Sequence, residues 1–226
     1  VLFRSAFKRQ LMRMNRLYGL RRVGENMTRI YFVRHCQSDH TKNSDERTRP
    51  LTAEGIEDSR AVLNYLKDKN IDVFISSPYK RSYDTIVKAA EYYHIQIQTD
   101  ERLRERKSGK NGNNFEMFKK RWADKNYAEP EGESLYSVQK RNIEAIQEIT
   151  ESYHDKNIVV GTHGTALSTI LNYYNPAFNC DDFIRMINYM PYIVKFEFDG
   201  TRYIGVTEEL IIEKEYKLPI LNTGNG

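Results

Sequence analysis

Residues 31–40 read YFVRHCQSDH, and the abrupt change of character within this stretch decides the fold. Apolar, strand-like residues end at Arg34 and His35, a permanent cation followed by a titratable imidazole. A chain that leaves a strand for a tight loop would most naturally continue with Gly, but Cys36 follows. The stretch therefore predicts a buried strand whose carboxyl end carries reactive side chains.

The bulk composition is that of a globular protein of ordinary size. The chain has 226 residues, of which 39% are hydrophobic and 29% are charged, which suits one domain with a real core. No apolar run approaches the roughly 20 residues that a membrane-spanning helix needs. The two cysteines, Cys36 and Cys180, have no ligand-like spacing, which argues against a zinc site and a disulfide framework. We therefore expect a cytoplasmic protein with no membrane partner, no metal and no cofactor.

The positive charge of the chain is concentrated near its amino end. Residues 1–26 contain seven arginines and lysines against one glutamate, a net charge of +6, whereas the whole chain carries +4. Residues 27–226 therefore carry −2. A nucleic-acid partner would need a basic face on the folded domain, so none is expected.

Residues 1–26 are interpreted as an extension outside the domain. Met27 stands just before the first expected strand, and the opening VLFRS can be encoded by the end of a common sequencing adapter. Our first interpretation is therefore translated non-coding sequence, and the second is an Arg-rich targeting presequence or a basic arm. In each case we expect one domain over residues 27–226.

From Met27 onward, strand-like and helix-like segments alternate. The alternation predicts an α/β protein with three layers, α/β/α, in which helices cover both faces of a mainly parallel sheet. Residues 192–206 alternate around Asp199-Gly200, which predicts a β-hairpin and hence an antiparallel edge. The other expected strands are 30–33, 71–78, 95–98 and 157–163, and the expected helices are 51–69, 79–93, 134–153 and 164–174.

Three of the expected strands end in residues that suit an anion. Arg34 and His35 end the first, Arg81 follows strand 71–78, and His163 ends strand 157–163 at the start of a helix. Ligands collect at the carboxyl ends of parallel strands, and arginines and helix N-termini both bind phosphate. Each residue alone is as often structural as functional, but their shared placement predicts a phosphate site.

The order and spacing of five motifs resemble a known family. YFVRHCQS, SSPYKRSYDT, LRERKSG, EGES and VVGTHGTALS are similar to the motifs of the histidine phosphatase superfamily, in its phosphoglycerate mutase-like branch. The likeness runs from Thr28 to at least Leu171. It implies a phosphoglycerate mutase-like fold and phosphoryl-transfer chemistry, and it does not indicate the substrate.

The resemblance also implies a role for each residue at the expected phosphate site. His35 would attack phosphorus and form a phosphohistidine, while Arg34, Arg81 and His163 would hold the phosphoryl oxygens. These roles make chemical sense, because a phosphomonoester dianion is a poor electrophile until its charge is neutralised. Arginines would then take the place that a metal ion fills elsewhere.

A proton donor and a hydroxyl would complete this site. The resemblance implies that Glu105 protonates the leaving alcohol and then activates water; Glu101 is its near rival, and a surface carboxylate is the alternative interpretation. Ser38 would either donate its hydroxyl to the phosphate or cap the loop. Ser134 is expected to be the N-cap of the long helix that follows it. The remaining histidines are expected to be surface or capping residues: His40, His94 and His154.

The sequence departs from the family pattern after the expected proton donor. RKSGKNGNN follows Glu105 in place of the aromatic-Gly run of the mutases. Residues 107–134 are expected to form a mobile excursion over the active-site mouth, with a short helix around Trp122. The cations of this segment are expected to be solvated rather than to attract substrate: Lys107, Lys110, Lys119, Lys120 and Arg121.

These observations predict a metal-independent phosphomonoester hydrolase that acts through a phosphohistidine on a small phosphorylated substrate. The alternative is a phosphoglycerate mutase, which would share these residues but must exclude water. An inactive homologue that binds a phosphorylated ligand is a third and less favoured hypothesis. The sequence indicates no oligomeric state.

Cys36 leaves two interpretations open. The first is that only a small side chain fits beside the nucleophile. The second is that the cationic site lowers the pKa of the thiol and makes the enzyme sensitive to oxidation.

Overall fold

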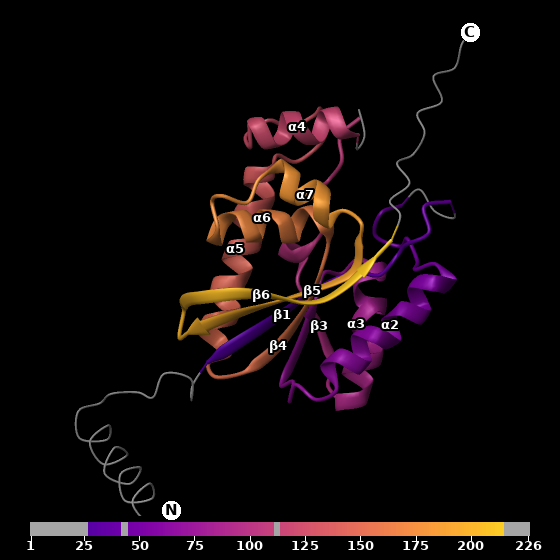
Figure 1. Ribbon diagram of the computed structural model, residues 1–226, viewed down its shortest axis with the longest axis vertical. Helices are drawn as coiled ribbons and strands as arrows, with labels where there is room; N and C mark the ends of the chain where they lie inside the picture. The colour runs from indigo at the N-terminus through magenta and orange to yellow at the C-terminus, as the bar shows by residue number, and fades with distance from the viewer. Residues whose placement is uncertain (1–26, 42–44, 111–113, 215–226) are drawn as a thin grey trace, which may run out of the picture.

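The computed structural model describes residues 27–41, 45–110 and 114–214 (Figure 1). The predicted extension, residues 1–26, lies outside the described residues, so the domain boundary at Met27 stays a prediction. Within the described ranges, no helix is both long enough and apolar enough to cross a membrane.

A six-stranded sheet runs through the centre of the structure, in the order β3-β2-β4-β1-β5-β6. The first four of these strands pair in parallel, whereas β5 is antiparallel to β1 and β6 is antiparallel to β5. The predicted α/β fold, with a mainly parallel sheet and an antiparallel edge, is therefore confirmed. In chain order the strands are β1 (Thr28–Arg34), β2 (Val73–Ser76), β3 (Ile97–Thr99), β4 (Asn157–Thr162), β5 (Tyr189–Asp199) and β6 (Arg202–Glu213).

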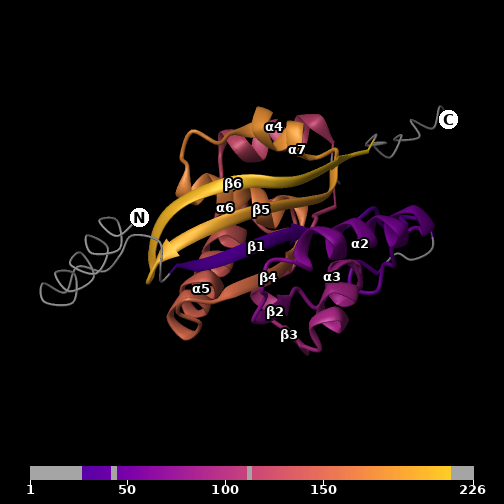
Figure 2. The ribbon, with the colours of Figure 1, turned by 60° about the horizontal axis from the view of Figure 1, so that its bottom comes forward.

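Helices cover both faces of this sheet, as Figures 1 and 2 show. In β1, Ile30 and Phe32 pack with the core on the α5 and α6 face, whereas Tyr31 and Val33 pack with the core on the α2 and α3 face. This burial on two sides explains why β1 reads as a continuous apolar run. The helices are α2 (Ala53–Leu66), α3 (Lys80–Tyr93), α4 (Phe115–Ala123), α5 (Leu135–Ser152), α6 (Gly164–Tyr174) and α7 (Cys180–Met186), with a 3-10 turn η1 (Glu101–Leu103).

Most element boundaries follow from local signals in the sequence. Ser134 caps α5 as predicted, because its hydroxyl accepts a hydrogen bond from the Ser137 N–H at 3.1 Å. The strand expected at 71–78 is shorter, since β2 spans only Val73–Ser76, and both strands of the hairpin are longer than expected. Helix α7 was not predicted, because seven residues are too few to show a helical period.

Gly161 allows the carboxyl end of β4 to lie against α3. A Cβ atom at this position would come within 2.7 Å of Ser76 Oγ and 2.9 Å of Ser82 Oγ. A larger residue would push α3 away from the sheet. The glycine therefore helps to bring Arg81, in the first turn of α3, close to the ends of β1 and β4.

Candidate active site

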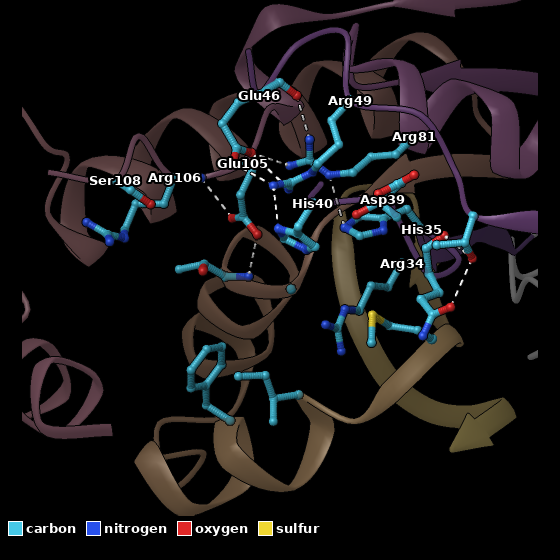
Figure 3. A pocket seen from close by; sticks show the side chains of 18 of the residues that line it. Arg34, His35, Asp39, His40, Glu46, Arg49, Arg81, Glu105, Arg106 and Ser108 are labelled. Atoms are coloured by element: carbon cyan, nitrogen blue, oxygen red, sulfur yellow. Dashed lines mark hydrogen bonds and ion pairs between the residues drawn. The ribbon is translucent and has the colours of Figure 1, made fainter. Parts of the chain in front are cut away.

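A cavity of about 580 Å³ opens at the carboxyl ends of the parallel strands. Five of the six residues predicted for the site line it: Arg34, His35, Ser38, Arg81 and Glu105. Figure 3 shows Arg34, His35 and Arg81 reaching the cavity from β1 and α3, with Glu105 across from them. The sixth, His163, is fully buried and does not line the cavity.

His35 is held in one tautomer by the backbone next to it. Its Nδ1 lies 2.6 Å from the carbonyl oxygen of Cys36. A carbonyl oxygen can only accept, so Nδ1 carries the hydrogen and Nε2 is left with its lone pair. Nε2 accepts a hydrogen bond from Arg81 Nε at 3.2 Å. The unprotonated nitrogen is therefore the one on the Arg81 side of the ring.

The surroundings of His35 keep its imidazole neutral. Burial is the main cause that holds its pKa well below the usual value, and the charges of Arg81 and Arg34 lower the pKa further. A neutral imidazole is the nucleophilic form, because protonation would remove the lone pair of Nε2.

Arg81 is the most buried cation of the site, with 1% of its surface exposed. Its guanidinium lies over the ring of Tyr79, 5.1 Å from the ring centroid. Burial, and then the charge of Arg49, lower the pKa of Arg81 to about 10, so the side chain stays charged at neutral pH. The early position of Arg81 in α3 directs this charge toward His35 and the cavity.

Arg34, the last residue of β1, connects the site to the last residue of α7 and the first residue of β5. Its Nη1 donates to the carbonyl oxygen of Tyr189 at 2.9 Å and to that of Met186. These two acceptors come from a part of the chain far from Arg34 in sequence. The placement of α7 and β5 therefore fixes the direction of this guanidinium.

His163 lies directly against His35. The two ring centroids are 5.3 Å apart in an edge-on arrangement, and His163 Nε2 lies 2.8 Å from Ser77 Oγ. Burial, followed by the charge of Arg81, holds the pKa of His163 well below its usual value. Its Nδ1 has no hydrogen-bond partner within the described part of the chain. The predicted contact of His163 with a phosphoryl oxygen stays a prediction.

The N-terminus of α6 binds Glu105 through two of its N–H groups, and the prediction that this helix start also binds phosphate stays a prediction. The Thr165 and Ala166 N–H groups donate to the two carboxylate oxygens of Glu105 at 3.1 and 3.2 Å, and the Arg106 N–H donates at 2.8 Å. A carboxylate is well placed there, because the helix dipole and the unpaired N–H groups favour an anion. The first turn of α6 thus orients the expected proton donor.

A second network holds the backbone around Glu105. Arg141 donates to the carbonyl oxygens of Arg104 and Glu105 at 2.7 and 3.2 Å, and it pairs with Glu133 at 3.1 Å. Although burial opposes it, hydrogen bonds from Arg104 and Arg141 lower the pKa of Glu133 to about 2. Glu101, the rival proton donor, pairs instead with Arg47 on the surface and does not line the cavity.

Several cavity residues were not predicted from the sequence. Glu46 and Arg49 come from the loop before α2, and His40 lies beside them. His40 is exposed, as predicted for a surface residue, and it also lines the cavity, where partial burial lowers its pKa. His94 caps the C-terminus of α3, and His154 is exposed, as expected. The apolar part of the cavity lining is formed by Phe118, Phe183, Ile187 and Met190.

Residues 107–134 reach the cavity through Ser108 and through Phe118 of α4. Arg121 of this segment was expected to be solvated, but it is 3% exposed. Arg121 and Arg106 both pair with the buried carboxylate of Glu129, Arg106 at 2.9 Å. We call Arg106, Arg121 and Glu129 the excursion cluster. It anchors the segment to the rest of the structure.

The thiol of Cys36 belongs to the apolar core and not to the site. Cys36 is fully buried among residues of the α2 and α3 face, and it does not line the cavity. Burial raises the pKa of the thiol to about 12. The interpretation that the cationic site lowers this pKa is therefore wrong.

A family model described as the histidine phosphatase superfamily, branch 1, matches residues 30–206. The chain belongs to this superfamily. It is 30% identical over 149 residues to the uncharacterized phosphatase PhoE of Bacillus subtilis, a match that covers 64% of this chain and 76% of PhoE. The family membership, the similarity to PhoE and the site described above identify the protein as a phosphatase.

Solved structures show the same fold. A mycobacterial glucosyl-3-phosphoglycerate phosphatase superposes with a TM-score of 0.65 at 19% identity, over 84% of this chain and all of that chain. A phosphoserine phosphatase of Entamoeba histolytica, in complex with 3-phosphoglyceric acid, superposes with a TM-score of 0.67 at 21% identity. That match covers 81% of this chain and 97% of the other. The predicted phosphoglycerate mutase-like fold is confirmed.

Proposed function

We propose that the protein hydrolyses small phosphomonoesters without a metal ion, through a phosphohistidine formed on His35. The observation that carries this proposal is the hydrogen bond between His35 Nδ1 and the Cys36 carbonyl oxygen. It fixes the hydrogen on Nδ1 and leaves the lone pair on Nε2, in a residue that lines the cavity beside Arg81. The lowered pKa keeps this nitrogen unprotonated at neutral pH.

The reaction takes two steps. In the first, the lone pair of His35 Nε2 attacks phosphorus, the bond from phosphorus to the alcohol oxygen breaks, and Glu105 gives that oxygen a proton. In the second, Glu105 takes a proton from water, the hydroxide oxygen attacks phosphorus, and the phosphorus–nitrogen bond breaks. Inorganic phosphate leaves, and His35 is neutral again. Arg34, Arg81 and His163 stabilise the phosphoryl charge throughout.

The test is hydrolysis of p-nitrophenyl phosphate in the presence of a chelator. We expect turnover and an acid-labile phosphoenzyme of intact mass plus one phosphoryl group, and we expect His35→Ala to abolish both. His40→Ala, a change of the other histidine on the cavity wall, should still form the phosphoenzyme. A phosphoenzyme that survives His35→Ala would contradict the proposal.

Glu105→Gln separates the proton-donor role from a structural one. p-Nitrophenolate leaves without protonation, so the first step on this ester should slow little. Alkyl phosphates need the proton, and their turnover should fall by about 10²–10⁴-fold. Because Glu105 also acts in the second step, which both substrates share, the deciding rate is that of phosphoenzyme formation, and an equal loss of that rate on both substrates would contradict the donor role. Phosphoryl transfer between positions of a phosphoglycerate, with little hydrolysis, would favour the mutase hypothesis.

A further inference from the structure

Two arginines share one carboxylate next to the nucleophile. Arg49 donates from Nη1 and Nη2 to the two carboxylate oxygens of Glu46, at 2.7 and 3.0 Å. Arg81 donates from Nη2 to Oε2 of the same carboxylate at 3.0 Å. Figure 3 shows the three side chains converging at the cavity. We call Glu46, Arg49 and Arg81 the site cluster.

The site cluster is joined directly to His35. The third nitrogen of the Arg81 guanidinium, Nε, donates to His35 Nε2 at 3.2 Å. A single guanidinium thus separates the Glu46 carboxylate from the nitrogen that attacks phosphorus. A phosphoryl group that approaches this nitrogen must use the donors of Arg81, and it would meet Glu46 on the same donors.

The exposed fraction of each side chain shows which member of the site cluster another group can replace. The side chain of Arg81 is 1% exposed and that of Arg49 is 11% exposed, whereas the side chain of Glu46 is 49% exposed. Two buried guanidinium groups side by side repel each other unless an anion lies between them. The half-exposed carboxylate can turn into water at little cost, but the arginines cannot follow it.

Arg47 of the same loop has a different environment. Its side chain is 50% exposed, it pairs with Glu101, and neither residue lines the cavity. The two arginines of this loop therefore differ in their partners and in their access to the cavity. Arg49 is turned inward to the cavity, and Arg47 is turned outward.

We propose that Arg49 binds the phosphoryl group together with Arg81, and that the carboxylate of Glu46 marks the place of the phosphoryl oxygens. This inference rests on the proposed function, since it needs a phosphoryl group at His35. Glu46 then competes with the substrate as an internal anion. His40 accepts a hydrogen bond from Arg49 Nη1 at 2.9 Å, which keeps the guanidinium in place when the carboxylate leaves.

A pair of matched variants tests the role of Arg49. Arg49→Ala and Arg47→Ala each remove one positive charge from the same loop. We expect Arg49→Ala to raise the KM for p-nitrophenyl phosphate and the inhibition constant of inorganic phosphate by about tenfold or more. Arg47→Ala should leave both near the wild-type values. Arg49→Lys keeps the charge but loses the paired donors, and its values should fall in between.

Glu46→Gln tests the competition in the opposite direction. The amide keeps the size of the side chain and removes its charge, so inorganic phosphate should inhibit about threefold more strongly or better. Glu101→Gln, the matched change on the outer pair, should leave this inhibition unchanged. Equal effects of Arg49→Ala and Arg47→Ala, or weaker phosphate binding in Glu46→Gln, would overturn the inference. Circular dichroism confirms that each variant is folded.

Calorimetric titration with inorganic phosphate separates the two proposals. If the wild-type protein binds phosphate but hydrolyses no ester, and Arg49→Ala loses the binding, the proposed function fails and the role of Arg49 stands. If the wild-type protein turns over and Arg49→Ala binds phosphate as well as wild type, only the role of Arg49 fails.

Discussion

The site cluster and the excursion cluster are built from the same residue types, two arginines around one glutamate, but their carboxylates differ in exposure. The Glu46 side chain is 49% exposed, whereas the Glu129 side chain is fully buried between Arg106 and Arg121. An anion that water can reach can give way to another anion. An anion without access to water can only be lost at a large cost. The comparison teaches that burial of the carboxylate, and not the identity of the residues, separates a ligand site from a structural anchor.

The largest difference between the clusters should appear in turnover. Arg81→Gln removes donors from the reacting centre and should lower kcat/KM by about 10²–10³-fold. Arg121→Gln makes the same chemical change in the excursion cluster and should leave the kcat of the folded protein near the wild-type value. Steady-state kinetics on p-nitrophenyl phosphate measure both. A similar loss of kcat in the two variants would mean that the clusters do not divide the two tasks.

Substitutions in the excursion cluster should lower the free energy of unfolding more than substitutions in the site cluster. Glu129→Gln leaves two buried guanidinium groups without a counter-charge, so the free energy of unfolding should fall by about 3–5 kcal/mol. Glu46→Gln also removes a counter-charge, but phosphate from the buffer can reach the two arginines through the cavity, so the change should cost about 1 kcal/mol or less in phosphate buffer. Urea unfolding followed by circular dichroism gives both values. Equal losses would remove the distinction between an exchangeable and a fixed carboxylate.

The pH dependence of the free energy of unfolding should arise from His35 and His163, which follow the ends of β1 and β4, and not from the excursion cluster. His35 and His163 have pKa values held well below the usual 6.5, mainly by burial. Below about pH 6.5 the unfolded chain binds protons that the folded protein does not, so the free energy of unfolding falls as the pH falls. The slope is at most about 1.4 kcal/mol per pH unit for each histidine.

Substitution of one of these histidines tests that assignment. His163→Gln should reduce the slope between pH 6.5 and 5, whereas His154→Gln, at an exposed position, should leave it unchanged. Denaturant unfolding at a series of pH values measures the slope. An unchanged slope in His163→Gln would show that the acid sensitivity arises elsewhere.

The smallest effect is expected at Cys36, next to the nucleophile in sequence but in the core by position. Its pKa of about 12 and its complete burial leave no thiolate to oxidise. Peroxide should therefore not change turnover more in the wild-type protein than in Cys36→Ser, as measured by residual activity after treatment. Loss of activity in the wild-type protein alone would show that the thiol is reached.

The sequence was sufficient to predict a site residue where its position at or just after the end of a strand determines where it lies. Arg34, His35 and Arg81 could be predicted because parallel strands end at one edge of a sheet, and alternating strands and helices indicate such a sheet. The motif resemblance added Glu105, which lines the cavity as expected. The first three predictions needed only local patterns and one rule of topology.

The sequence was insufficient where two segments far apart must meet. Arg49 turns inward to pair with Glu46, which Arg81 of α3 also binds, and Arg47 turns outward to pair with Glu101 of η1. No periodic pattern in the sequence records these contacts. Likewise, only the fold shows that Glu105 occupies two N–H groups at the N-terminus of α6. Arg121 was predicted to be a surface cation, because its buried partner Glu129 follows α4 in a stretch without regular structure, where no sequence pattern indicates the pairing.

The position of β1 inside the sheet affects how the chain folds during its synthesis on the ribosome. β1, which ends one residue before His35, pairs with β4 and β5, both in the last third of the chain. Among the described residues, no segment close to β1 in sequence pairs with it as a strand. Backbone pairing on both sides of the nucleophile must therefore wait until nearly the whole domain has been synthesised. Such distant pairing is typical of slow folding, and the cavity at the end of β1 is complete only after β4 and β5 have paired with that strand.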